Sequence, residues 1–240
     1  MPKLLNPCVD PIFKALFTDN SPEAHKALTS LLEAILEQKV SNVELLPNEL
    51  SGECIDDRQT VFDISCLLND IEPVNIEMQS INLYEAFDKR AEYHVAHLLN
   101  HVVKKGTTWD KIPKSYQISV LDFIYDDKHT DVCSHYYMKS DNGSTLANRL
   151  NVYFIELPKV LNISDDISQL TTTQKWAKYF KYANREDKQE YVKNLIQSED
   201  GIMNAQAVLS KISLDDAMWI KQNHYFEENN RTETIKSDSF

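Results

Sequence analysis

The stretch that most constrains this chain is Thr60–Gln79, TVFDISCLLNDIEPVNIEMQ. Apolar and polar residues alternate on both sides of an Asn/Asp/Pro cluster, which predicts two antiparallel strands joined by a tight turn. If the chain folds back about Asp70, Asp63 lies opposite Glu77. Directly opposed residues in such a pair have Cβ atoms about 5 Å apart. Because two carboxylates at that distance repel each other, a folded protein that keeps them together usually has a cation there.

The polar face of this hairpin also has a simpler explanation. Ser65, Asn75 and Gln79 lie on the same predicted face as the two acids. Most antiparallel hairpins have one face in contact with water, and the residues of this stretch alone favour that explanation over a metal site. The rest of the chain therefore has to decide between them.

Composition limits the classes of protein to which the chain can belong. Its 240 residues suit one medium domain, or one domain with a small helical appendage. Glycine is scarce, and neither a G-x-G-x-x-G nor a Walker sequence is present. The net charge of -12 argues against broad nonspecific nucleic-acid binding, so a nucleic-acid enzyme of this composition would need a local basic patch and a metal ion.

The sequence also suggests a compartment. No apolar run is long enough to span a bilayer, and the N-terminus lacks the apolar core of a signal peptide. The four cysteines are scattered without C-x-x-C spacing, which is typical of reduced packing residues. We therefore expect a cytoplasmic protein without membrane contact.

Helical and strand patterns alternate up to about residue 163. Asp10 followed by Pro11 predicts a helix with Asp10 as its N-cap, and Ser21-Pro22 predicts a second helix. Further strands are expected at 43–50, 115–125, 133–139 and 150–157, and a long helix at 82–105. The near-continuous apolar strands predict a mixed sheet covered by helices on both faces.

The helix at 82–105 carries Arg90, His94, His97 and His101 on one face. The three histidines could bind structural zinc, but no acid or cysteine joins them in the sequence. Contact of this face with a phosphate backbone, or simply with water, is the favoured alternative.

Helices dominate after Asp165. A helix predicted at 173–195 carries lysines at three- and four-residue steps, among them Lys175 and Lys178, with aromatic residues between them. A solvated face is the common explanation of such a pattern, and a basic edge that contacts nucleic acid is the functional one. Shorter helices are expected at 204–210 and 214–223. Residues 227–240 are polar and aperiodic, and we expect a disordered tail there.

Four blocks in order resemble the Rpn-type recombination-promoting nucleases, also called PD-(D/E)XK nuclease family transposases. The blocks are DPIFKALF (Asp10–Phe17), FDISCLLNDIEPVNIEMQ (Phe62–Gln79), FDKRAEYHVAHLL (Phe87–Leu99) and YFIELPK (Tyr153–Lys159). An acid followed by E-x-Q is a weak motif alone, whereas four ordered blocks are specific. The resemblance covers residues from about Asp10 to Leu161.

The resemblance implies an α/β, restriction-endonuclease-like core, in which helices flank a central mixed sheet. The helical pattern after Asp165 predicts a C-terminal helical region beyond this core. It implies a DNA endonuclease that depends on Mg (or Mn), linked to recombination or transposition, with no organic cofactor. Asp63, Glu77 and Gln79 would be catalytic, and the metal ligands would be Asp63, Glu77 and the main-chain carbonyl of Met78. Asp10 and Arg90 would be accessory. The helix faces described above, rather than the resemblance, make His94, His97, Lys175 and Lys178 candidates for contact with nucleic acid. The wider superfamily has lysine at the position of Gln79, and glutamine carries no charge.

Several expectations follow. We divide the chain into a nuclease core at 1–163, a helical region at 164–226 and the tail at 227–240. We expect DNA as a partner. We also expect a homodimer, because double-strand cleavage by a single-site nuclease commonly needs two subunits. A catalytically weak nucleic-acid-binding or regulatory protein, and a ribonuclease of the same architecture, remain alternatives.

Overall fold

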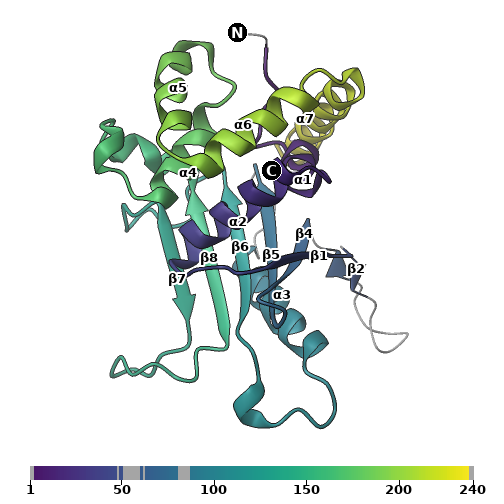
Figure 1. The fold of residues 1–240 in the computed structure, drawn as a ribbon, viewed down its shortest axis with the longest axis vertical. Helices are drawn as coiled ribbons and strands as arrows, with labels where there is room; N and C mark the ends of the chain where they lie inside the picture. The colour runs from purple at the N-terminus through teal and green to yellow at the C-terminus, as the bar shows by residue number, and fades with distance from the viewer. Residues whose placement is uncertain (1–2, 48, 51–59, 62, 81–86, 238–240) are drawn as a thin grey trace.

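The computed structural model is built around a six-stranded sheet with the predicted hairpin in its interior (Figure 1). The structure describes residues 3–47, 49–50, 60–61, 63–80 and 87–237. The strand order is β1-β4-β5-β6-β8-β7. The strands are β1 (Val43–Leu46), β4 (Ile64–Leu68), β5 (Glu72–Gln79), β6 (Ser115–Leu121), β7 (Cys133–Tyr137) and β8 (Leu150–Glu156). A separate pair joins β2 (Glu49–Leu50) to β3 (Thr60–Val61).

The sheet is mixed, as predicted. Strand β5 runs parallel to β6, and β6 runs parallel to β8. Strands β1, β4 and β7 are antiparallel to their neighbours. The predicted strand at 43–50 is divided between β1 and β2. Residues 51–58, whose polar sequence predicts a loop, lie outside the described residues.

The turn of the hairpin explains its register. Asn69 and Asp70 have φ angles of 50° and 67°, and the Ile71 amide donates to the Leu68 carbonyl at 3.0 Å. Two consecutive positive φ angles match a type I′ turn, a conformation that Asn and Asp tolerate. The turn pairs Ile64 with Ile76. One step further along this register, Asp63 lies opposite Glu77, as the alternation predicted.

Seven α-helices lie in the described part of the chain. They are α1 (Asp10–Thr18), α2 (Pro22–Leu36), α3 (Phe87–Val102), α4 (Thr172–Tyr182), α5 (Gln189–Gln197), α6 (Asp200–Ile212) and α7 (Asp216–Ser237). Short 3-10 turns are η1 (Trp109–Lys111), η2 (Leu157–Asn162), η3 (Ile167–Gln169) and η4 (Glu186–Lys188). Within the described ranges, none of these helices combines the length and the apolar character that crossing a membrane requires.

Helices cover the two faces of the sheet unequally. The larger core joins α1, α2, α4 and α6 to the face formed by side chains such as Ile64, Ile76 and Ile118. Helix α3 covers the other face through a small cluster that includes Phe87, Val95 and Phe154. Helix α4 belongs to the same core as α1, because the rings of Phe13 and Phe180 lie 5.6 Å apart. Gly201 allows α6 to approach α2, since a Cβ there would lie 2.0 Å from Ser30 Oγ.

Two helix predictions are wrong. The helix expected at 173–195 is two helices, α4 and α5, separated at 183–188. The tail expected to be disordered from 227 is helical as far as Ser237. Apolar residues form no stripe along α7, so periodicity did not reveal it. Its first half is held instead by specific contacts, including a bond from the Asn6 amide to Gln222 Oε1 at 2.7 Å and a bond between the Tyr225 and Ser80 hydroxyls.

Candidate functional site

Asp63 closes the open end of the hairpin. It lies just before β4, and its Oδ2 accepts the Met78 amide at 3.3 Å. In a β-strand the N–H and C=O of one residue point to the same side. The Met78 carbonyl therefore points toward the same edge of β5 as Asp63, so the Asp63 carboxylate and the Met78 main-chain oxygen lie along one edge of that strand. The Met78 side chain is buried.

Glu77 is a buried carboxylate with only partial charge compensation. Its side chain accepts the Ser119 hydroxyl at 3.0 Å, and Arg90 Nη2 lies 3.7 Å from Oε1. His94 Nδ1 lies 3.8 Å from Oε2. Burial raises the pKa of Glu77 to about 7, opposed by the charge of Arg90 and reinforced by the charge of Asp63. A cation bound here would favour the ionised form.

Arg90 joins the two polar residues at the end of β5. Its Nη2 donates to Gln79 Oε1 at 2.7 Å while lying near Glu77, and its guanidinium lies 5.4 Å from the centre of the Phe87 ring. Arg90 comes from the first turn of α3, so the packing of α3 on the sheet fixes its position. Gln79 and Arg90 therefore form one unit beside Glu77.

Asp10 belongs to this cluster and does not cap its helix. Val9 occupies the N-cap position, and no side-chain cap bond is present at α1, so the predicted capping role is wrong. Asp10 Oδ2 lies 3.2 Å from Lys14 Nζ, and the same Nζ lies 3.0 Å from Asp63 Oδ1. Burial, with the nearby charge of Asp63, raises the pKa of Asp10 to about 6. Asp10 Oδ1 is buried without a hydrogen-bond partner among the described residues.

Lys14 is the functional candidate that sequence reasoning missed. Its position four residues after Asp10 places both on one helix face, which was the available signal. The sequence could not indicate that this face would meet Asp63, because that contact depends on how α1 packs against β4 and β5.

A buried chain of hydrogen bonds leads from the sheet interior to Glu77. Asn75 donates to Gln117 at 2.8 Å, Gln117 donates to Ser119 at 3.1 Å, and Ser119 donates to Glu77. All four side chains are buried. Gln117 and Ser119 alternate with apolar residues along β6, which is a period-two pattern. The sequence did not indicate a polar face there, because the segment as a whole is strongly apolar.

Several predicted contacts are not part of this site. Lys178 is fully buried and pairs with Asp165 at 2.6 Å, so its assignment to nucleic acid is wrong. The side chain of Lys175 is only 16% exposed, lies 3.5 Å from Glu199 and donates to a main-chain carbonyl, which also argues against that role. His94 is buried beside Glu77 rather than presented to a ligand.

The histidines of α3 do not form a zinc site. His97 stacks on Tyr93 with ring centres 5.7 Å apart, while His94 faces Glu77. Across the described ranges, no three His, Cys, Asp or Glu side chains are gathered closely enough to hold a metal. The possible metal ligands at the hairpin are instead the carboxylates of Asp63 and Glu77 and the main-chain carbonyl of Met78. Asp10 lies nearby, paired with Lys14. This oxygen-only set matches the preference of Mg²⁺, and the buried orphan oxygen of Asp10 adds a further acceptor.

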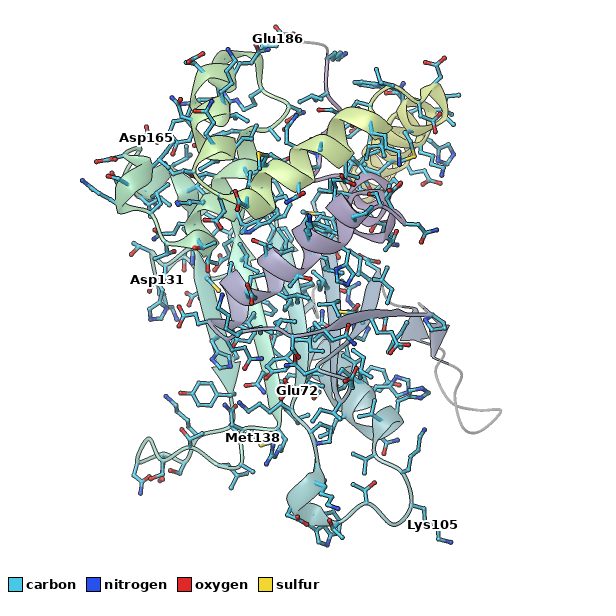
Figure 2. The ribbon with its side chains drawn as sticks, viewed as in Figure 1. Glu72, Lys105, Asp131, Met138, Asp165 and Glu186 are labelled. Atoms are coloured by element: carbon cyan, nitrogen blue, oxygen red, sulfur yellow. The ribbon has the colours of Figure 1, made fainter. Side chains whose placement is uncertain are left out.

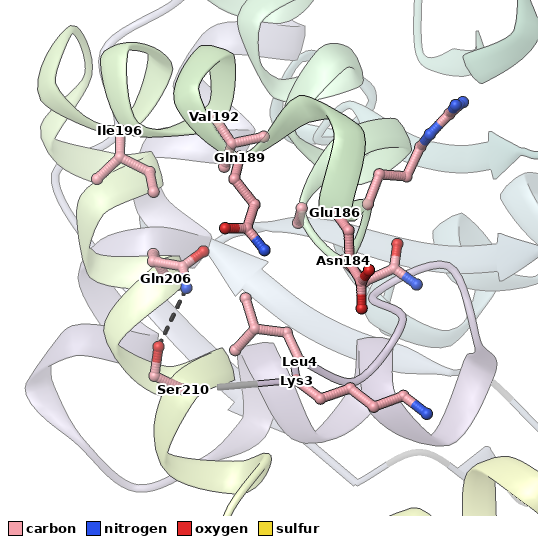
Figure 3. A pocket seen from close by; sticks show the side chains of 11 residues that line it. Lys3, Leu4, Asn184, Glu186, Gln189, Val192, Ile196, Gln206 and Ser210 are labelled. Atoms are coloured by element: carbon pink, nitrogen blue, oxygen red, sulfur yellow. Dashed lines mark hydrogen bonds between the residues drawn. The ribbon is translucent and has the colours of Figure 1, made fainter. Parts of the chain in front are cut away.

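A pocket of about 420 Å³ lies elsewhere, between the N-terminal segment, α5 and α6 (Figure 3). Leu4, Val192 and Gln206 are among its lining residues, and Gln206 donates to Ser210 at 3.0 Å. None of the candidate site residues lines it. This pocket is therefore separate from the cluster formed by the hairpin and α1.

The mixed sheet with flanking helices, and the acids at the end of its interior hairpin, define the restriction-endonuclease-like class of nuclease folds. Comparison with known families agrees. The model of the PD-(D/E)XK nuclease family transposases matches residues 7–232, and the chain belongs to that family. The match extends well beyond Leu161, so the C-terminal helices are part of what the family shares. Searches of curated proteins and of solved structures found no match.

Proposed function

We propose that this protein is a metal-dependent DNA endonuclease that hydrolyses phosphodiester bonds during transposition or recombination. Membership of a nuclease family linked to transposition supports the class of reaction. The observation that carries the proposal is the convergence of Asp63, Glu77, Gln79 and Arg90 at one end of the hairpin, with Lys14 bound to Asp63.

Asp63, Glu77 and the Met78 carbonyl would hold Mg²⁺ or Mn²⁺. Such an ion, when bound, would supply positive charge at the scissile phosphate and lower the pKa of a bound water. Oxygen ligands of this kind suit both ions. Glu77, whose pKa is raised by burial, would release its proton as the ion binds.

Lys14 supplies the positive charge that Gln79 lacks. Its ammonium lies within 3.2 Å of both Asp10 and Asp63, so α1 delivers a cation to the first acid of the hairpin. We propose that Lys14 stabilises negative charge on the phosphate as cleavage proceeds. Gln79, whose oxygen accepts from Arg90, would orient water through its amide, and Arg90 would offset further charge.

Two finer expectations belong to this proposal. Double-strand cleavage by a nuclease with one site in each chain commonly needs two subunits, so we propose a homodimer, and light scattering at working concentration measures it. We also propose a cytoplasmic location, to be checked by cell fractionation.

Cleavage of supercoiled plasmid with Mg²⁺, Mn²⁺ or EDTA tests the function directly, with a labelled RNA of matched sequence in parallel. We expect cleavage of DNA with either metal and none with EDTA. Glu77→Gln should lower the rate by about 10³-fold or more, because metal charge contributes several kcal/mol to such reactions. Glu44→Gln, which removes an exposed acid from β1, is the matched control. A pure protein that binds DNA and never cuts it with any divalent metal would overturn the proposal, and cutting of RNA alone would reassign the substrate.

A further inference from the structure

Two long loops leave the same end of the sheet. Residues 103–114 join α3 to β6, and residues 138–149 join β7 to β8. Their bases meet where the Ser115 amide donates to the Arg149 carbonyl at 2.8 Å. Figure 2 shows Lys105 and Met138 at this end of the molecule, opposite the end that carries Glu186. We call residues 103–114 and 138–149 the basic loops.

The basic loops carry a net positive charge, whereas the chain as a whole is negative. The first contains four lysines (Lys104, Lys105, Lys111 and Lys114) and one acid, Asp110. The second contains Lys139 and Arg149 against Asp141. Within the described ranges none of these six basic side chains forms an ion pair with an acid. In a protein with a net charge of -12 this end is therefore a local site of attraction for anions.

Trp109 is the second observation at this end. It is 87% exposed and lies in the first loop between Lys105 and Lys111. Trp is among the residues that proteins bury most extensively, so an indole left in water is informative. An aromatic ring flanked by lysines is the combination that binds single-stranded nucleic acid, because a base stacks on the ring while phosphates meet the cations.

Helix α3 connects the basic loops to the candidate site. Arg90, His97 and His101 are spaced by seven and four residues, which places them along one side of α3, and Lys104 follows two residues after the helix ends at Val102. From Arg90 to Val102 the helix rises about 18 Å. A nucleic-acid strand that leaves the site along α3 would reach the loops within about six nucleotides, even at the roughly 3.4 Å spacing of a stacked strand.

We propose that the basic loops bind an unpaired segment of the nucleic-acid substrate, with Trp109 stacked on a base and the lysines on adjacent phosphates. This inference rests on the proposed function, since it concerns the same substrate. It also assigns the contact with nucleic acid, which the sequence suggested for Lys175 and Lys178, to a surface that is exposed. The preferred substrate would then be DNA with single-stranded nucleotides beside the cleavage position rather than an uninterrupted duplex.

Fluorescence anisotropy of the full chain in EDTA tests binding without cleavage. The probes are a labelled single strand and a blunt duplex, each about 20 nucleotides long so that both exceed the roughly six-nucleotide span. Trp109→Ala should weaken single-strand binding by about 5- to 100-fold with little change in salt dependence, and Trp109→Phe should retain most of the affinity. The triple variant Lys104→Gln/Lys105→Gln/Lys111→Gln should reduce the slope of log K against log salt by about 2.

A charge-matched control is the triple variant Lys26→Gln/Lys193→Gln/Lys221→Gln, which changes exposed lysines on α2, α5 and α7. We expect it to change the slope by less than the loop variant does. Direct evidence comes from intrinsic fluorescence, because Trp176 is buried and Trp219 is packed against the core, so quenching by a single strand should vanish in Trp109→Phe. Circular dichroism of each variant confirms folding.

The outcomes separate the two proposals. The inference would be overturned, even if the enzyme cuts DNA, by either of two results. One is that the loop variants keep the affinity, salt slope and quenching of the wild type, and the other is that duplex binds more tightly than the single strand. Binding that depends on Trp109 in a protein that never cleaves would leave the inference standing and remove the nuclease proposal.

Discussion

The two faces of strands β4, β5 and β6 are equally buried and chemically opposite. One face carries Ile64, Ile76 and Ile118, each 0% exposed, and packs into the main core. The other carries Asn75, Gln117 and Ser119, also 0% exposed, and leads to Glu77. Burying polar groups costs free energy unless they are hydrogen-bonded. Among the described residues, Ser65 Oγ and Asn75 Oδ1 find no partner, so the polar face is not arranged for stability alone.

Side chains at adjacent positions of one strand therefore have different roles, because they point to opposite faces of the sheet. The apolar face stabilises the fold, and the polar face holds a carboxylate whose ionisation is opposed by burial. Perturbed ionisable groups of this kind concentrate at functional sites. Substitutions on the two faces should therefore separate stability from activity.

The largest effect on stability is expected at Ile118. Ile118→Ala leaves a cavity in the main core and should lower the free energy of unfolding by about 2–5 kcal/mol. The rate of cleavage by the protein that remains folded should change little. Urea denaturation and a plasmid assay at low temperature measure the two quantities.

Ile71→Ala is the control for this comparison. Ile71 lies in the turn of the same hairpin and is 61% exposed, so its removal should cost under about 0.5 kcal/mol. A large loss of activity in folded Ile118→Ala would contradict the separation of the two faces.

Lys14 tests the functional side of the comparison. Lys14→Gln should lower the cleavage rate by about 10²-fold, since removing one donor from a developing charge costs about that much. Lys14→Arg should recover part of the rate, because it retains the charge with a different shape. Single-turnover cleavage at saturating metal is the measurement.

Lys26→Gln, an exposed lysine on α2, is the matched control for Lys14→Gln and should cleave at the wild-type rate. Wild-type cleavage by Lys14→Gln would show that Lys14 serves only to hold Asp10 and Asp63.

The pH dependence of stability should reveal Glu77. Burial raises its pKa to about 7, above the value of about 4.3 typical of an unfolded chain. The folded state therefore favours the protonated form, and stability present below about pH 4.3 is lost as pH rises through about 7. In EDTA, Glu77→Gln should become more stable than the wild type by about 1–3 kcal/mol between pH 5 and 8.

Added Mg²⁺ should reduce that difference, because an ion that binds only the folded wild type stabilises it. Thermal unfolding of both proteins across the pH range, with and without metal, checks both statements. A difference that stays constant with pH would contradict the raised pKa.

The sequence predicts the hairpin well because its information is local. Alternation and the Asn69-Asp70 turn determine the register, and the register places Asp63 opposite Glu77. The mixed sheet and the family of the chain were predicted from the four sequence blocks, which occur in the same order as in the family. These features depend on residues close together in the chain, where patterns are informative.

Lys14 and Lys178 show why the remainder could not be predicted. Both are lysines at helical spacing, yet Lys14 reaches the site from α1 while Lys178 is buried against Asp165 and Tyr191. The difference lies in which elements pack against each helix. A helical pattern identifies a face of the helix and not the residues that this face will contact.

The smallest effect is expected at Ser119, at the point where the polar face meets the site. Ser119→Ala removes the hydroxyl that donates to Glu77 and should lower stability by about 0.5–1.5 kcal/mol. Ser115→Ala is the matched control, because Ser115 donates to the Val95 carbonyl from the same strand and face. Both variants should lose similar stability, but only Ser119→Ala should shift the metal concentration needed for half-maximal cleavage, by a few-fold. Because the hydroxyl stabilises the ionised carboxylate, its loss should raise that concentration, and equal metal dependence in the two variants would separate the polar chain from the site.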